Sequence, residues 1–536
     1  MMTPRHVSKM TALLMLLMST CAGADAPQRS TEIALANRLT WGATLSDVRQ
    51  MDANGIEAWL HDQLYPTGRD DLPPAATAQI KALPMLQKSA AALALELDAQ
   101  VTAAKAAQAA FATMPSAQPQ PNPPMAPGTA TATMSPAPNA PPTPQQVRNT
   151  YLGEAQRETQ ARHMLRDLYA PHQLREQMTW FWFNHFNVYT DKGEIRIFLA
   201  DYEDRALRPN ALGNFRTLLE ATLRSPAMLQ YLDNAQNAAG HINENYAREI
   251  MELHTMGVGS GYTQQDVQEL ARILTGVGVA PPNNIVNVAP KFQPLLIHDG
   301  MFVFNPQRHD FGEKMFLGHV IHGSGYDEVR QALDILCAQP ATAQHISRQL
   351  AQYFVADAPP PSLVNAMAQR FLTTNGDIAA VLDLMIHSPE FRASLGKPLL
   401  KDPQHYVISA VRMAYDDRVI LNTRPMLNWL NQLAEPLYGH LTPDGYPMDR
   451  TAWNGPGQVE QRFEIAQAIG SGNAGLFKAD GPNTIAQPAF PNLQGALFYN
   501  GLSETLAPQT RAGLAQATSP QEWNIFFLAS PDFMRR

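Results

Sequence analysis

Apolar residues recur at intervals of three and four along most of this 536-residue chain. The pattern predicts α-helices with one apolar face, most clearly in the segments 174–189, 213–232, 326–355, 361–374 and 378–391. Residues 283–304 are the exception, because short apolar runs at each end flank a connection, as the strands of a hairpin do. The sequence therefore predicts a mostly α fold, with a large multi-helix domain and a small β-hairpin excursion.

A proline-rich stretch interrupts this pattern at residues 112–146. It contains no charged residue, and proline occupies about every third position. Proline fixes φ and removes a backbone donor, which predicts a disordered linker or insertion. An alanine-rich helix over residues 88–111 precedes the stretch and a second helix over 145–170 follows it. We expect these helices to form a hairpin whose tip carries the proline-rich stretch.

The chain opens with the pattern of a cleavable secretion signal. Arg5 and Lys9 precede a short apolar stretch, and Ala22 and Ala24 then supply an Ala-x-Ala cleavage site. The apolar stretch is shorter than the roughly 20 residues that span a bilayer, so no membrane span is expected. A lipid-anchored form through Cys21 is the alternative, although the three residues before it make a poor lipid-attachment motif. Export to the periplasm or the medium follows from this signal.

The predicted organisation has four parts. They are a signal peptide (1–24), an N-terminal helical part of the main domain (25–111), the proline-rich segment (112–146) and the main helical domain with the motif segments (147–536). Removal of the signal peptide changes the net charge from −8 to −10 and leaves Cys337 as the single cysteine. An acidic chain does not favour nucleic-acid binding, and one cysteine excludes an intramolecular disulfide.

The segment 241–271 is the densest in charged residues. On a helical wheel, one arc holds the polar residues of its first half, while the apolar residues and His254 fill the other. Gly257 is suited to end this helix, and Thr263 with Asp266 to start the next one. The polar arc contains His241, Glu244, Asn245, Arg248, Glu249 and Glu252.

Two interpretations of this polar arc are open. It is either a solvated helix face, on which Glu244 and Arg248 form an i,i+4 ion pair, or a chemical site. In the second case Glu249 and Glu252 act as acid and base or as metal ligands, because neighbouring carboxylates have their pKa values pushed apart. No zinc-protease or di-iron motif supports the metal version.

Two further segments carry candidate chemistry. Asn184 and His185 lie within the aromatic run 180–186, where buried polar groups need partners. The segment 304–318 gathers His309, Asp310 and Lys314 near a glycine, as functional loops do. The alternatives are an aromatic core helix whose histidine bonds to a backbone carbonyl, and a structural turn in which Asp310 caps and Lys314 pairs with an acid.

These segments together resemble the bacterial family called domain of unknown function 1800. The resemblance rests on Asn243–Glu249, Glu252–His254 and Gly261–Val267, on the aromatic Phe181–Phe186 element, and on Phe302–Lys314. It extends over nearly the whole mature chain except the proline-rich segment, and it weakens towards the C-terminus. The resemblance implies export and, from genome context, a partner of the 1501 family of exported, sulfatase-like proteins. It implies no reaction.

Three functions fit these observations. The first is a periplasmic hydrolase or transferase, with Glu244, Glu249, Glu252, His309 and Asp310 as catalytic candidates and Arg248, Lys314, Asn184 and His185 as substrate-binding candidates. This function requires the segments to converge in one cleft. The second is a helical binding or assembly protein, in which the same residues form buried ion pairs. The third is a divalent-metal module, which requires three or more of His185, His241, His309, Asp310 and the glutamates around one point.

Overall fold

The computed structural model describes residues 26–67, 71–113, 140–281, 283–284, 286–416, 418–479, 484–485, 487 and 489–536. The predicted signal peptide and most of the proline-rich segment lie outside this set. Helices dominate the described residues, which confirms the mostly α fold class. None of the helices in these ranges is long and apolar enough to cross a membrane.

The chain forms two compact units, each assembled from separate stretches of sequence. The smaller unit comprises residues up to 68, 391–429 and 450–536, and the larger comprises 69–390 and 430–449. The smaller unit holds α2 (Ala26–Leu39), α3 (Leu45–Asn54), α4 (Ile56–Leu64), α19 (Pro403–Ala414), α21 (Pro456–Gly470), α22 (Ser503–Thr505), α23 (Pro508–Leu514) and α24 (Pro520–Leu528). Helices α18 (Pro389–Leu395) and α20 (Arg424–Gln432) lie at the boundaries of the two sets of residues. The domain boundaries given above stay a prediction.

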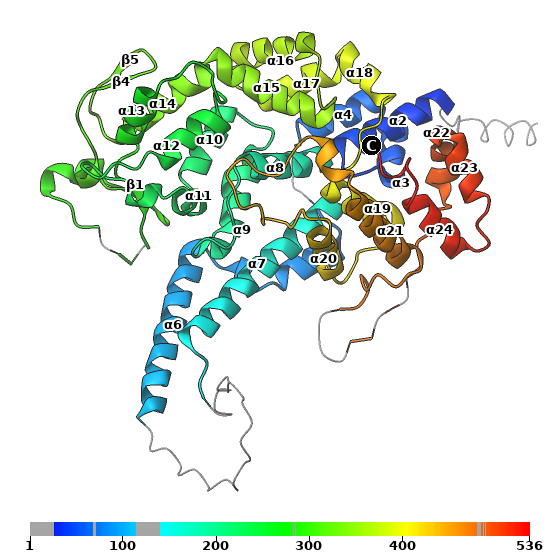
Figure 1. Ribbon diagram of the computed structural model, residues 1–536, viewed down its shortest axis with the longest axis horizontal. Helices are drawn as coiled ribbons and strands as arrows, with labels where there is room; N and C mark the ends of the chain where they lie inside the picture. The colour runs from blue at the N-terminus through cyan, green and yellow to red at the C-terminus, as the bar shows by residue number, and fades with distance from the viewer. Residues whose placement is uncertain are drawn as a thin grey trace, which may run out of the picture. The chain divides into compact units, whose positions relative to one another are not determined.

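The larger unit holds most of the helices. They are α5 (Pro74–Lys81), α6 (Ala90–Ala112), α7 (Pro144–Tyr169), α8 (Gln173–His185), α9 (Leu199–Asp201), α10 (Phe215–Leu223), α11 (Pro226–Tyr231), α12 (Asn245–Glu249), α13 (Gln264–Ile273), α14 (Tyr326–Ala338), α15 (Pro340–Phe354), α16 (Pro361–Thr373) and α17 (Ile378–Ile386). Helices α6 and α7 pack along each other as the expected hairpin (Figure 1). The hydroxyl of Tyr151 donates to Glu96 across this pair at 3.1 Å.

The β structure differs in detail from the expected hairpin. Strand β3 (Phe302–Phe304) pairs on one side with β2 (Ile297–Asp299) and on the other with β1 (Val277–Val279), both antiparallel. The expected partner, 283–290, contains no strand among its described residues, because the nearer run at 297–299 closes a shorter turn. A second hairpin, β4 (Lys314–Phe316) with β5 (His319–Ile321), lies where only a loop was expected.

The glycine break after α12 forms as expected. Helix α12 continues into a π-helical turn at Ile250–His254, and Gly257 follows at φ +90° with its N–H donating to the Met251 carbonyl at 3.1 Å. Thr263 then caps α13, because its hydroxyl accepts from the Asp266 N–H while the Asp266 carboxylate accepts from the Thr263 N–H. The π-turn matters because such turns are frequent at functional sites.

Candidate functional site

Asn184 lies at the end of α8, where it anchors a loop. Its side-chain oxygen accepts from the Tyr446 N–H at 2.6 Å, and its amide nitrogen donates to the Tyr446 carbonyl at 2.9 Å. Gly445 lies at φ +72°, and a Cβ there would be 2.1 Å from the Asn184 carbonyl oxygen. The loop therefore requires glycine at this point, and the Asn184 amide is already occupied by backbone groups.

Three histidines gather beside this anchor. The His185 ring is 5.9 Å from the His254 ring and 6.3 Å from the His345 ring, between centroids. His185 donates from Nε2 to the His254 carbonyl at 3.1 Å, and His345 donates from Nε2 to the Leu253 carbonyl at 3.1 Å. Both ring nitrogens of His254 are buried without a hydrogen-bond partner among the described residues. The carbonyl acceptor that the alternative interpretation assigned to His185 is therefore present.

All three imidazoles are held in the neutral form. Burial, followed by the repulsion that His345 would exert if both rings were protonated, lowers the pKa of His185 to about 3. Burial also lowers the pKa of His254 well below its ordinary value and lowers that of His345. No carboxylate contributes to any of these shifts, which explains their common direction.

A small cavity opens between these residues. Its volume is about 50 Å³, and it is lined by Phe181, Asn184, His185, Leu253, His345, Gln349, Asp444 and Met448. Asp444 is exposed at 63 % and lies near His440, whose Nε2 is 3.4 Å from its carboxylate. Substrate pockets commonly measure roughly 300–1,000 Å³. This cavity has room for water molecules and not for a metabolite.

Glu249 is the unpaired acid of the polar arc. It is partly exposed, and no hydrogen bond or ion pair joins it to another described residue. Burial raises the pKa of the Glu249 carboxyl, and the charges of Glu252 and Asp444 raise it further, while Arg248 opposes them. Asp444, which lines the histidine cavity, is therefore one of the two acids whose charge acts on Glu249.

The other charged residues near Glu249 on the polar arc form ion pairs. Arg248 bridges Glu244 at 3.2 Å and Glu252 at 3.3 Å, one turn before and one turn after it. Gln264, at the start of α13, donates to Glu244 at 2.7 Å and accepts from Arg248 at 2.8 Å. These contacts include the predicted Glu244–Arg248 pair and describe a partly exposed helix face with satisfied charges.

The His309 segment forms a closed network inside the larger unit. His309 contacts the Thr275 carbonyl through Nδ1 and the Glu328 carboxylate through Nε2, each at 2.8 Å. Lys314 donates to Glu328 and to the Asp310 carbonyl. Glu328 also accepts from the N–H groups of Ser324 and Gly325, so it caps α14. The side chains of His309, Lys314 and Glu328 are 0 % exposed.

Glu328 is ionised within this network. Burial alone would raise the pKa of its carboxyl, but the hydrogen bonds from His309 and Lys314 lower it. Asp310 is also paired, because its carboxylate accepts from Arg272 and from the Gly312 N–H, each at 2.8 Å. These contacts match the structural turn considered above, in which Asp310 caps and Lys314 pairs with an acid.

The two motif segments contact opposite ends of α13. Glu244 and Arg248 bond to Gln264, whereas Asp310 bonds to Arg272, eight residues further along the helix. At a rise of 1.5 Å per residue, these positions are about 12 Å apart along the axis. The structure therefore places Glu244 and Arg248 apart from the cluster of His309, Asp310 and Lys314, and the charge of Asp444 is what relates Glu249 to the His185 cavity.

The motif segments belong to one recognised family. The sequence model of a family described as "Protein of unknown function (DUF1800)" matches residues 34–535. The chain belongs to this family. No curated protein and no solved structure matches the chain.

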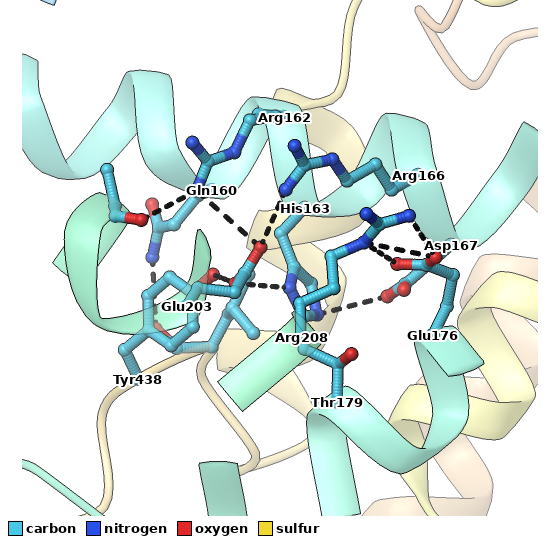
Figure 2. A network of polar contacts seen from close by, with 12 residues as sticks. Gln160, Arg162, His163, Arg166, Asp167, Glu176, Thr179, Glu203, Arg208 and Tyr438 are labelled. Carbon is cyan, nitrogen blue, oxygen red and sulfur yellow. Dashed lines mark hydrogen bonds and ion pairs between the residues drawn. The ribbon is translucent and has the colours of Figure 1, made fainter. Parts of the chain in front are cut away.

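This DUF1800 chain contains a further network that the sequence did not reveal (Figure 2). Glu203, on a π-helical turn (Tyr202–Leu207), accepts from Tyr438 at 2.6 Å and lies 2.8 Å from Nδ1 of His163. Arg162 and Arg166, both on α7, flank the same carboxylate, at 3.6 and 3.4 Å. The signal was present in α7, where His163 and Asp167 lie one turn apart among the buried residues of the helix.

The metal-module function requires three or more ligands around one point in this DUF1800 chain. Within the ranges that the structure describes, no group of three or more histidine, cysteine, aspartate or glutamate side chains is placed to hold a metal ion. His241, one of the residues considered as a ligand, is exposed at the start of the α12 segment.

Proposed function

We propose that this DUF1800 chain is an exported helical binding or assembly protein that acts with a partner of the 1501 family. The observation that carries the proposal is the closed network of His309, Lys314 and Glu328. A catalytic acid or base must come within hydrogen-bond reach of its substrate. Groups that are fully buried and bonded to one another are suited instead to hold strands, loops and helix ends in place.

The remaining candidates support the same proposal. Arg248 neutralises two of the three glutamates on the α12 face, and Asn184 is occupied by the Tyr446 backbone. Neighbouring segments expose apolar side chains: Val258 is 76 % exposed and Leu441 is 64 % exposed. An interface combines an apolar centre with a polar rim, so exposed apolar side chains near paired charges suit a protein-binding surface.

The test is a calorimetric titration of the purified chain with the exported 1501-family protein encoded by the same genome. We expect a dissociation constant on the order of 1 micromolar or tighter, as specific interfaces give. The double variant Val258→Asp, Leu441→Asp should bind at least tenfold more weakly, whereas Ile485→Asp, at an exposed site of the smaller unit, should bind normally. No binding by the wild-type chain at roughly 100 micromolar partner would contradict the proposal.

The second candidate function is a hydrolase or transferase, and it rests on Glu249 alone. A partly buried carboxyl with a raised pKa, unpaired and near Asp444, has the properties of a general acid. This function predicts that the chain cleaves a chromogenic ester, phosphoester or glycoside. It also predicts that Glu249→Gln abolishes cleavage while Glu313→Gln, at an exposed site, does not. Such a result would replace the binding proposal.

A further inference from the structure

The smaller unit contains a cavity that is much larger than the histidine cavity. Its volume is about 620 Å³, within the range of roughly 300–1,000 Å³ common for small-molecule sites. Helix α2, the end of α18 and the last segment of the chain supply most of its lining. Apolar side chains form one part of the wall, among them Ile33, Leu395, Met413, Leu506 and Phe527.

The charged lining of this cavity is strongly basic. Five cationic side chains contribute to it, namely Arg38, Arg392, Lys401, Arg535 and Arg536. Asp532 supplies the single acidic side chain in the lining, and its carboxylate accepts from the Ala507 N–H at 2.9 Å. The cavity therefore combines an apolar wall with an excess of positive charge.

Lys401 is the most informative of these cations. It is 2 % exposed, and its ammonium lies 3.8 Å from the centre of the Phe533 ring. No hydrogen bond or ion pair joins this ammonium to any other residue that the structure describes. A buried ammonium costs several kcal/mol unless an anion or acceptor compensates it.

The two charges that act most strongly on Lys401 are both positive. Burial, followed by the charges of Arg462 and Arg536, lowers the pKa of Lys401 well below its ordinary value. Burial and the charge of Arg536 also lower the pKa of Arg38, to about 9. An anion placed in the cavity would relieve this repulsion and would raise both pKa values.

We propose that this cavity binds a small organic anion with an apolar body, and that Lys401 bonds to its acidic group. The buried cation selects the anionic end, and the apolar wall selects a hydrocarbon or aromatic body over a bare inorganic ion. This site is independent of the partner-binding function proposed above, since it uses none of the α12 or His309 residues.

The test is calorimetry of the full mature chain with octanoate, octan-1-ol and inorganic phosphate as probes. We expect octanoate to bind more tightly than either of the others, because it alone carries both a charge and an apolar body. Lys401→Met should weaken octanoate binding at least tenfold, as loss of a charge-assisted hydrogen bond does. Lys397→Met is the matched control, because Lys397 is exposed on the same segment and does not line the cavity; it should bind normally.

Two further measurements distinguish a loss of octanoate binding from a loss of folding. Without ligand, Lys401→Met should unfold at a higher temperature than the wild type, since it removes an uncompensated buried charge. Arg392→Met changes an exposed cavity residue, so it should fold normally and weaken octanoate binding severalfold. Equal octanoate binding by the wild type and Lys401→Met, phosphate binding as tight as octanoate, or no binding of octanoate would each overturn the proposal.

Discussion

Two buried histidines in the larger unit, His163 and His185, differ in the groups that surround them. His163 lies between carboxylates, with Asp167 at 3.1 Å and Glu203 at 2.8 Å (Figure 2). His185 has instead a backbone carbonyl and two other histidines around it. Burial opposes the charged form in both places, but the carboxylates outweigh it at His163 and raise the pKa of that ring to about 10.

Burial alone therefore does not decide whether a histidine is protonated. Charged neighbours make the His163 group a structural ion network, in which each member depends on the others. Without them the His185 group is neutral, keeps unsatisfied ring nitrogens on His254 and borders a cavity. Removing a charge from the His163 group should therefore lower the free energy of unfolding, and so should adding a charge to the His185 group.

The largest effect is expected for Glu203→Gln. The substitution leaves His163 and two arginines without their shared buried carboxylate, which should lower the free energy of unfolding by about 3–5 kcal/mol. Urea denaturation followed by circular dichroism measures this loss. Asp98→Asn, at an exposed site on α6, is the control and should stay within about 0.5 kcal/mol of the wild type. A Glu203→Gln variant as stable as this control would show that the network contributes nothing.

The next largest effect is expected on acidification, which should destabilise the folded chain through His185. A folded pKa below the unfolded value stabilises at high pH, so the contribution of neutral His185 is present above pH 6.5 and is lost as the pH falls towards 3. The loss is about 1.4 kcal/mol per pH unit for one histidine. Between pH 6.5 and 5, the wild type should therefore lose about 2 kcal/mol more than His185→Gln, which keeps a donor but does not titrate. Identical pH slopes for the two proteins would refute the neutral assignment.

The sign is reversed at His163. A folded pKa raised above the unfolded value stabilises at low pH, so this contribution is present below pH 6.5 and is lost as the pH rises towards 10. Between pH 7 and 8, His163→Gln should show a slope shallower than the wild type by about 1.4 kcal/mol per pH unit. Urea denaturation across this interval measures the difference, and equal slopes for the wild type and His163→Gln contradict it.

The sequence predicted the fold class from the three- and four-residue apolar spacing, and it predicted the local caps at Gly257, Thr263 and Asp266. These features depend on neighbouring residues alone. The pairing of β3 was wrong because two apolar runs competed as its partner, and their choice depends on the turn that joins them. The Glu203 network was missed because His163 and Tyr438 lie 40 and 235 positions from Glu203, separations that spacing rules do not address.

The site candidates stay a prediction, but the structure shows how they are grouped. Of the residues chosen for their chemistry, His185, His309 and Lys314 make polar contacts in the structure, whereas Glu249 makes none with the other described residues. Helix α13 then decides which of them meet, because it holds the two segments at opposite ends. That arrangement follows from tertiary packing, as does the meeting of Asn184 with Tyr446 across 262 residues.

A smaller effect is expected for Asn184→Ala, beside the His185 cavity. The change leaves the buried Tyr446 N–H and carbonyl without their partner, which should lower the free energy of unfolding by about 1–3 kcal/mol. Hydrogen exchange should show faster exchange at Tyr446, measured against its neighbours. Asn149→Ala, whose side chain accepts from Gln145 on the exposed face of α7, should change neither quantity. Unaltered exchange at Tyr446 would show that Asn184 does not anchor the loop.

The smallest effect is expected for Glu249→Gln. The pKa of this carboxyl is raised by burial and by two acids, so ionised Glu249 opposes folding at neutral pH. Because the side chain is partly exposed, solvent screens most of this term, and the substitution should stabilise the chain by no more than about 0.5 kcal/mol at pH 7. The advantage should vanish near pH 4, where the carboxyl is protonated in both states.

Glu252→Gln provides the contrast on the same helix face. Glu252 pairs with Arg248, so its substitution should destabilise the chain by a few tenths of a kcal/mol where Glu249→Gln does the opposite. Paired urea titrations at pH 7 and pH 4 resolve the two signs. If Glu249→Gln is clearly destabilising, the Glu249 carboxylate has a favourable partner in the folded chain. Glu249 is then not an unpaired acid, and the enzymatic alternative, which rests on that property, is refuted.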